Sequence, residues 1–111
     1  MNTTEITGTR YHFGIEEDSY YLFMLQDEEG NYLMIQKALE FDKQDIELGM
    51  DTYYIEINDQ GKAGYGGVET LVLEDKSIKI TISGIVIVLN TTNREIEIDK
   101  VFKDLKGLIT N

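Results

Sequence analysis

The 111-residue sequence contains no cysteine and no proline. Without cysteine the chain has no disulfide framework, no thiolate nucleophile and no cysteine metal site, a composition that fits the reducing cytosol. A chain of this length corresponds to one ordinary domain and can bury about two-thirds of its unfolded surface without cross-links. We therefore expect a single domain over residues 1–111, stabilised by its apolar core.

Long apolar runs are also missing from the sequence. No stretch approaches the roughly 18 consecutive apolar residues of a membrane span. Residues 1–14 have neither the basic start nor the apolar run of a secretory signal. We expect a cytoplasmic protein without a membrane partner.

Basic residues are scarce: ten lysines and arginines stand against 21 aspartates and glutamates, giving a net charge of −11. The imbalance lies in residues 16–59, which hold thirteen acids and two bases, whereas the two signs balance elsewhere. A nucleic-acid binder needs a basic track that displaces counterions from phosphates, so we expect no direct nucleic-acid ligand. A basic partner is favoured, because opposed potentials accelerate encounter. Solubility alone explains the acidic composition equally well.

The first half of the chain contains segments rich in aromatic and β-branched residues, which are typical of strands. Residues 10–15 and 20–26 predict one hairpin. Residues 27–38, with the turn residues Gly30 and Asn31, predict a second hairpin. Residues 39–50 fit neither the helix period nor the strand period, and we interpret them as a short helical turn ending at Gly49.

The strand predicted at residues 52–58 has two distinct faces, because side chains alternate along a strand. Its core face carries Tyr53, Ile55 and Ile57, and its other face carries Tyr54, Glu56 and Asn58.

The second half of the chain predicts antiparallel strands at residues 68–73 and 77–83. Residues 84–90 form an apolar run too short to distinguish a strand from a helix. Residues 94–98 alternate as in a strand, with Ile96 and Ile98 directed inward.

A C-terminal helix is predicted after residue 98, with Asp99 as its N-cap. One apolar stripe of this helix needs a surface on which to be buried; it consists of Val101, Phe102, Leu105, Leu108 and Ile109. The predicted fold class is therefore α+β, with a mostly antiparallel sheet of six to eight short strands and the C-terminal helix packed on one face.

No catalytic or metal-binding constellation is recognisable. The single histidine, His12, lies in a predicted strand without a nearby titrating partner, and no serine lies in a G-x-S-x-G motif. Residues 58–69 have the length of an EF-hand loop, but Gln60 and Lys62 stand where acidic ligands are needed. We expect neither enzymatic activity nor a cofactor or metal site.

A glycine-rich connection follows the strand at residues 52–58, and it lacks the Lys-Ser/Thr pair of a phosphate-binding loop. A wide hairpin turn or a bulge is predicted from the backbone freedom of its glycines, which are Gly61, Gly64, Gly66 and Gly67. Two interpretations of Tyr65 remain open. Its ring covers an edge of the core, or it stands beside Tyr54 and Glu56 as a binding anchor.

The pattern D-x-Q-D-x-x-L-G-M-D runs from Asp42 to Asp51, followed by a tyrosine-rich strand and then D-Q-G and Y-G-G. With these motifs, residues 38–73 resemble the tenth family of bacterial polymorphic-toxin immunity proteins. The resemblance implies a non-catalytic protein, made alongside a toxin, that binds the cognate toxin domain and blocks it.

The acidic composition and the resemblance lead to one hypothesis for the site. We expect an acidic, tyrosine-containing surface to face a basic groove on the toxin domain. The candidate residues of that surface are Asp42, Asp45, Glu47, Asp51, Tyr54, Glu56 and Tyr65.

Two other classes of function stay open at the level of sequence. A small-molecule-binding module would need a deep pocket with converging polar groups, for which the region beneath Tyr65 is the candidate. A self-associating structural protein would use an uncovered strand edge. Homo-oligomerisation is possible, but no sequence motif indicates it.

Overall fold

The computed structural model describes residues 2–110, and it describes side chains for residues 3–58 and 63–110. Within this range the chain forms nine strands and two helices. In order they are β1 (Asn2–Gly8), β2 (Arg10–Glu16), β3 (Tyr20–Gln26), β4 (Tyr32–Ala38), α1 (Lys43–Glu47), β5 (Tyr54–Ile57), β6 (Asp59–Tyr65), β7 (Val68–Glu74), β8 (Ser77–Ile82), β9 (Ile85–Thr91) and α2 (Ile98–Ile109).

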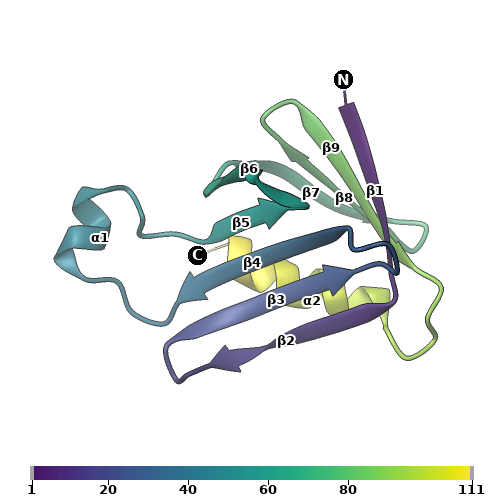
Figure 1. The fold of residues 1–111 in the computed structure, drawn as a ribbon, viewed down its shortest axis with the longest axis horizontal. Coiled ribbons are helices and arrows are strands. Elements are labelled where there is room, and N and C mark those ends of the chain that lie inside the picture. The colour runs from purple at the N-terminus through teal and green to yellow at the C-terminus, as the bar shows by residue number, and fades with distance from the viewer. Residues whose placement is uncertain (1, 111) are drawn as a thin grey trace.

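The strands form two sheets, ordered β1-β9-β8-β7 and β2-β3-β4-β5-β6. Neighbouring strands are antiparallel except for the parallel pair β1–β9. Figure 1 shows the five-stranded sheet facing the viewer with α2 behind it. The predicted α+β class, with mostly antiparallel pairing and a C-terminal helix, is confirmed. The structure has more strands than the six to eight predicted, and it divides them between two sheets.

The core lies between the inner faces of the two sheets and the apolar stripe of α2. The predicted alternation in β5 and β8 is confirmed, because Ile55, Ile57, Ile78 and Ile80 are all buried. The open question of residues 84–90 is resolved in favour of a strand, β9. Side chains with no exposed surface are Ile6, Phe23, Leu25, Leu33, Ile35, Ile78, Ile80, Ile87, Leu89, Val101 and Leu105.

Helix α2 is fixed by contacts with both sheets. Its stripe is buried as predicted at Val101, Leu105 and Leu108, and it packs against β7 and β8 of the four-stranded sheet. On the other side the Tyr11 hydroxyl donates a hydrogen bond to Asp104 Oδ2 at 2.6 Å. Burial, together with this bond to a carboxylate, raises the pKa of Tyr11. No helix within residues 2–110 is long and apolar enough to cross a membrane.

The strand predicted at residues 94–98 is wrong, because the chain turns there and α2 begins at Ile98. Asn93 accounts for the turn: its Oδ1 accepts a hydrogen bond from Glu95 N at 2.9 Å, and its own N–H donates to Thr91 Oγ1 at 3.0 Å. Asp99 is not the N-cap either. The cap position belongs to Glu97, and Asp99 lies in the first turn, where its negative charge favours the helix dipole.

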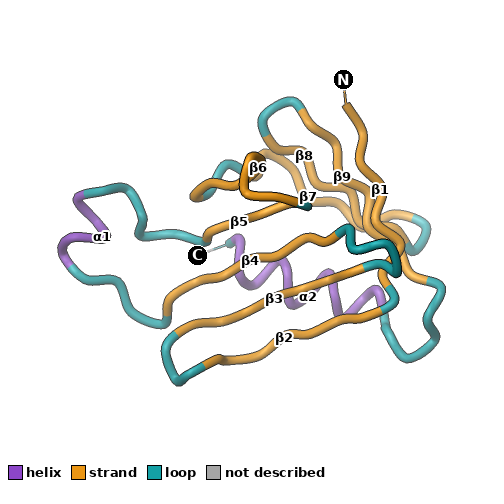
Figure 2. The backbone as a smooth tube through the Cα atoms, viewed as in Figure 1, coloured by secondary structure: helices purple, strands orange, loops and turns teal. Residues whose placement is uncertain are grey.

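The predicted glycine-rich connection is itself mostly a strand, β6, which pairs antiparallel with β5 (Figure 2). A positive φ of 58° at Asn58 reverses the chain, and the register of the β5–β6 pair shifts between Glu56 and Ile57. The reversal thus falls before the glycines from which a wide hairpin turn or a bulge was predicted. Gly66 and Gly67, with φ of 70° and 94°, then lead the chain from one sheet into the other. Gly61 lies outside the residues whose side-chain environment is described.

Candidate functional site

One face of the five-stranded sheet is left uncovered. It is the outer face, turned away from α2, and Figure 1 shows it towards the viewer without a helix over it. Strand register places Met24 beside Met34 and Met34 beside Glu56 on this face, and it aligns Gln36 with Tyr54 in the next row. The large aromatic and apolar side chains of the outer face are Tyr20, Leu22, Met24, Tyr32, Met34, Tyr54 and Tyr65.

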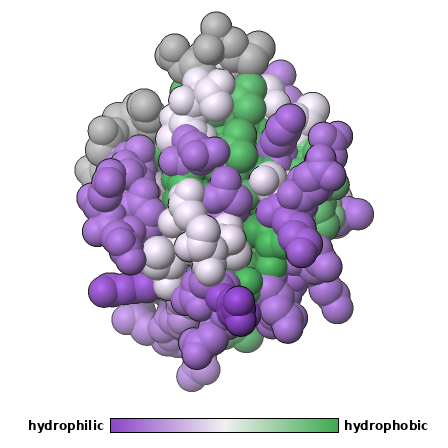
Figure 3. All heavy atoms as spheres, turned by 90° about the vertical axis from the view of Figure 1, so that its right-hand side faces the viewer, coloured by the Kyte–Doolittle hydropathy of each residue, from purple (hydrophilic) through white to green (hydrophobic). Residues whose placement is uncertain are grey.

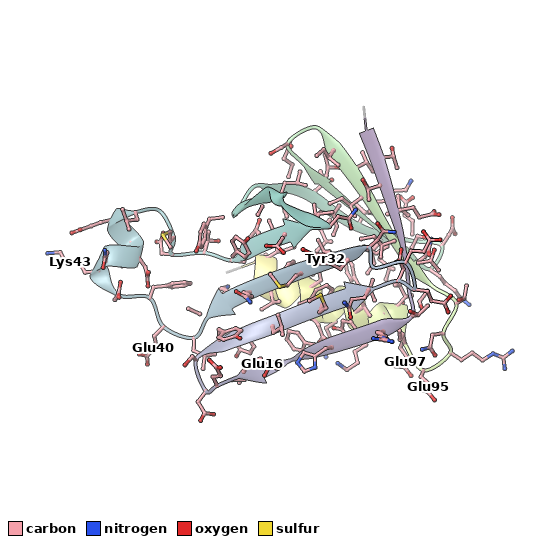
Figure 4. The ribbon with its side chains drawn as sticks, viewed as in Figure 1. Glu16, Tyr32, Glu40, Lys43, Glu95 and Glu97 are labelled. Carbon is pink, nitrogen blue, oxygen red and sulfur yellow. The ribbon has the colours of Figure 1, made fainter. Side chains whose placement is uncertain are left out.

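Four residues of the outer face form a connected cluster around one carboxylate. The Tyr32 hydroxyl donates to Glu56 Oε2 at 2.5 Å, and the Tyr54 hydroxyl donates to Glu56 Oε1 at 2.7 Å. The Tyr65 ring lies edge-on to Tyr54 with centroids 5.4 Å apart. We call Tyr32, Tyr54, Glu56 and Tyr65 the tyrosine cluster. Figure 4 labels Tyr32 on β4.

Glu56 points away from the core, as predicted, yet only 8% of its surface is exposed. The hydroxyls of Tyr32 and Tyr54 each donate to one of its oxygens, which makes burial of this carboxylate tolerable. The hydrogen bonds from Tyr32 and Tyr54 lower the pKa of Glu56, and the bond to Glu56 raises the pKa of Tyr54. At neutral pH the cluster therefore holds a fixed negative charge and two phenol rings of fixed orientation.

This electrostatic link predicts a pH-dependent effect of Glu56→Gln on stability. A carboxylate whose folded pKa is lowered stabilises the protein above its unfolded pKa, and the contribution disappears as the pH falls through the folded pKa. Wild type should exceed the variant in free energy of unfolding by on the order of 1–3 kcal/mol at pH 7. Urea unfolding should show this difference shrinking steadily below about pH 4.5.

Wild type and Glu56→Gln share all other acids. The difference between their free energies of unfolding therefore cancels the contribution of those acids to the pH dependence. Tyr54→Phe, which deletes one donor to Glu56, should reproduce part of the pH-dependent loss. A wild-type advantage that stays constant from pH 7 to pH 3 would contradict the electrostatic role of Glu56.

The second group of candidate residues lies on the connection between β4 and β5, residues 39–53, which we call the α1 loop. Figure 1 shows it projecting beyond the end of the sheet. Asp42 caps α1: its Oδ1 accepts from Asp45 N at 2.7 Å, and Asp45 Oδ2 accepts from Asp42 N at 3.1 Å. Gly49, with φ of 72°, ends the helical turn, so this prediction is confirmed.

The other acids of the α1 loop are free of such a structural task. Glu47 approaches Lys43 Nζ at 3.9 Å, an exposed pair of little energetic weight. Asp51 is exposed. Figure 4 shows Lys43 and Glu40 at the projecting end of the molecule. No hydrogen bond or ion pair between described side chains joins these acids to the tyrosine cluster.

A family model described as immunity protein 10 matches residues 9–100, a range that includes the α1 loop and the tyrosine cluster. The chain belongs to the immunity protein 10 family. The resemblance inferred from residues 38–73 is thereby confirmed. Neither the curated proteins nor the solved structures contain a significant match to the chain.

In this immunity protein 10 family member the predicted site residues fall into two groups. The structure brings Tyr54, Glu56 and Tyr65 into contact, and it places Asp42, Asp45, Glu47 and Asp51 on the α1 loop. The structure shows features of both interpretations of Tyr65: its ring lies against Tyr54 and is 46% exposed, and it also borders the hollow beside Ile55 and Ile82.

Three residues of the site were missed in the sequence. Tyr32 joins the tyrosine cluster because β4 pairs with β5, a neighbour relation that sequence alone does not give. Ile46 and Leu48 are 58% and 62% exposed on the α1 loop. The sequence did contain an indication of their exposure: apolar residues in an acidic segment that match neither the helix period nor the strand period do not form a core-facing stripe.

The region beneath Tyr65 contains a hollow of about 350 Å³, where a small-molecule site was considered. Most of its lining is glycine backbone and aliphatic side chains, including Ile55, Ile57 and Ile82. Tyr65 and Ser83 are the polar side chains among its lining residues. A specific ligand site usually combines an apolar wall with several converging polar groups, so the hollow gives that alternative little support.

Proposed function

We propose that this chain is a non-catalytic immunity protein that binds a cognate toxin domain and blocks it through an acidic, tyrosine-containing surface. The observation that carries the proposal is the match of the immunity protein 10 family to residues 9–100. Immunity proteins of a polymorphic toxin system act by binding, which calls for a stable surface rather than a reactive centre.

The geometry of the tyrosine cluster supports binding through the outer face. Tyrosine is enriched at binding hot spots, because its ring offers a large contact area at a small cost in conformational entropy. Here Glu56 fixes the hydroxyls of Tyr32 and Tyr54, and Tyr54 supports Tyr65. The partner therefore meets rings that are already ordered.

The charge distribution supports a basic partner. The α1 loop carries five acids against the single base Lys43; the acids are Glu40, Asp42, Asp45, Glu47 and Asp51. Figure 3 shows the end of the molecule that lies away from the α1 loop, where hydrophilic side chains border a narrow apolar strip. We infer that the toxin domain presents lysine or arginine residues towards the α1 loop.

The direct test is co-purification with the product of the adjacent upstream gene, tagged on its C-terminal domain. We expect a stable one-to-one complex and rescue of growth when both proteins are produced. A titration at two salt concentrations should show weaker binding at the higher one. A correctly folded protein that captures no partner and rescues no cell would overturn the proposal.

Charge reversal on the α1 loop should slow association. Glu47→Lys with Asp51→Lys changes exposed side chains that do not cap α1, whereas changing Asp42 or Asp45 would also disturb the helical turn. We expect the association rate at low salt to fall by about 10-fold or more, with reduced salt dependence, because electrostatic steering is weakened. Stopped-flow mixing with the toxin domain measures both quantities.

The matched control reverses Glu28 and Glu29, which are exposed in the turn between β3 and β4. That turn lies at the opposite end of β4 from the α1 loop, and the control makes the same change in net charge. Equal slowing by the two pairs would mean that the total charge, rather than the α1 loop, attracts the partner.

A further inference from the structure

The α1 loop is much longer than the fold requires. β4 and β5 are antiparallel neighbours, paired from Leu33 with Ile57 to Gln36 with Tyr54. Two residues suffice to connect such strands, whereas the chain uses residues 39–53. Connections of this length in small domains commonly serve binding or catalysis. The extra residues therefore need an explanation other than topology.

The shape of the α1 loop is maintained by its own hydrogen bonds. Besides the reciprocal cap of Asp42 and Asp45, Leu48 N donates to Gln44 O at 3.0 Å. Met50 N donates to Asp45 O at 2.8 Å. Helix α1 buries no residue. The helical part of the loop thus adopts a defined shape without burying a side chain in the core, whereas Tyr53 at the end of the loop is anchored there. A segment that is already ordered lowers the entropic cost of binding.

This ordered loop holds apolar side chains in solvent. Ile46 is 58% exposed and Leu48 is 62% exposed, and Leu39 at the base of the loop is 40% exposed. Their exposure does not stabilise the free protein. Burial against a partner lowers the free energy in proportion to the apolar area removed from water. Acidic side chains flank them, with Glu47 between the two and Asp51 close behind.

We propose that the α1 loop inserts into an apolar hollow of the toxin domain whose rim carries lysine or arginine. Ile46 and Leu48 lie two residues apart on the helical turn, so they contact different walls of the hollow. The inference rests on the proposed function and specifies the chemistry of the partner surface. The loop projects from the body (Figure 1), so its complement is concave. The acids around the apolar pair match a basic rim.

A second copy of this chain fits the α1 loop poorly. The protein carries a net charge of −11, and residues 16–59 account for the whole imbalance. Two α1 loops meeting each other would bring like charges together. The part of a second copy outside residues 16–59 carries eight acidic and eight basic residues, so it offers no net positive charge to attract the loop. The charge therefore selects a basic partner over self-association.

The test replaces the apolar anchors without altering charge. The double variant Ile46→Ser with Leu48→Ser should bind the toxin domain about 100-fold more weakly or worse, measured by calorimetry. Its thermal unfolding should match wild type, because both side chains lie outside the core. Val72→Ser is the matched control: Val72 is 41% exposed on β7, and its loss should change affinity less than about 3-fold.

A loop-excision variant tests the inference with the same partner. Residues 39–51 are replaced by Asn-Gly, which joins Ala38 to Thr52 through a two-residue turn. We expect the shortened protein to fold and to lose binding. Should it fail to fold, the serine double variant still decides the question.

The outcomes separate this inference from the proposed function. Wild-type binding together with full binding by the serine variant would overturn loop insertion and leave the immunity role intact. Absence of binding by wild type would overturn both. Sedimentation of wild type alone as a dimer, converted to monomer by the serine substitutions, would show that a second copy occupies the loop and would also overturn the inference.

Discussion

Gly8→Ala is expected to destabilise the protein by about 1–3 kcal/mol, although alanine is normally the better residue in a strand. A β-carbon at Gly8 would lie 2.3 Å from Leu25 Cδ1 and 2.7 Å from Leu25 Cγ. Leu25 has no exposed surface, so it can move only by displacing the surrounding core. In a chain of this size each kcal/mol should lower the melting temperature by about 4–8 °C, which calorimetry would detect.

Gly14 provides a matched control within the next strand. A β-carbon there would come no closer than 3.8 Å to His12 Nε2, an ordinary contact on the outer face. Gly14→Ala should be neutral or stabilise the fold by up to about 1 kcal/mol, because it restricts the unfolded chain. Equal effects of the two substitutions would contradict the contact between Gly8 and Leu25 as the cause.

A double-mutant cycle tests the contact itself. Leu25→Ala alone should cost about 2–5 kcal/mol by leaving a cavity. When Gly8→Ala is added, the new methyl group enters that space, so the combined loss should be smaller than the sum of the separate losses. Strict additivity would mean that the two positions do not touch in solution.

Sequence periodicity predicted the strands whose alternation is strong, and it missed β1, whose signal is not local. β8 alternates Ile78, Ile80 and Ile82 with polar residues, so its inner face was recognisable. In β1, Ile6 is the one large apolar residue, and its partner β9 lies near the other end of the chain. The pairing between β1 and β9 is decided by tertiary contacts, which no window of sequence contains.

Competition between alternation and local hydrogen bonding explains the error at residues 94–98. Ile96 and Ile98 alternate as in a strand, but Asn93 bends the backbone before them. Both isoleucines still contact the core, one from a turn and the other from the first turn of α2. Apolar spacing thus predicted burial correctly while giving the wrong backbone.

The candidate site was predictable only where it depends on local alternation, and not where it depends on which strands are neighbours. Alternation placed Tyr54 and Glu56 on one face of β5, but register brings Tyr32 and Tyr65 to them from two other strands. Conversely, Asp42 and Asp45 were read as partner-binding charges, and their spacing is also that of a capping box. Their cap explains the shape of the α1 loop, and any contact they make with a toxin remains a prediction.

In the proposed complex we expect the tyrosine cluster and the α1 loop to contribute to binding in different ways, because their chemistry differs. The loop offers charge and two apolar side chains on a projecting segment, whereas the outer face offers rings held against a sheet. Charges at a rim mainly affect the rate of association, and ordered aromatic anchors mainly affect the rate of dissociation. Variants of the two regions should therefore separate in kinetics even where their affinities agree.

Tyr65→Ala is expected to weaken toxin binding by about 2–4 kcal/mol, mainly through faster dissociation. The Tyr65 ring is 46% exposed, yet its contact with Tyr54 and the bond from Tyr54 to Glu56 hold it in place. A partner can therefore bury it at little entropic cost. Calorimetry with the toxin domain measures the affinity, and urea unfolding should show a loss of only about 0.5–1.5 kcal/mol from the broken ring pair.

Two further variants identify what Tyr65 contributes. Tyr65→Phe keeps the ring pair with Tyr54 and should retain most of the affinity if the ring is the anchor. Tyr20→Ala removes a tyrosine from the same outer face at its β2–β3 end and should matter less, because Tyr20 is not part of the hydrogen-bonded cluster. Wild-type affinity in Tyr65→Ala would return Tyr65 to the other interpretation, in which its ring only covers the hollow beside Ile55 and Ile82.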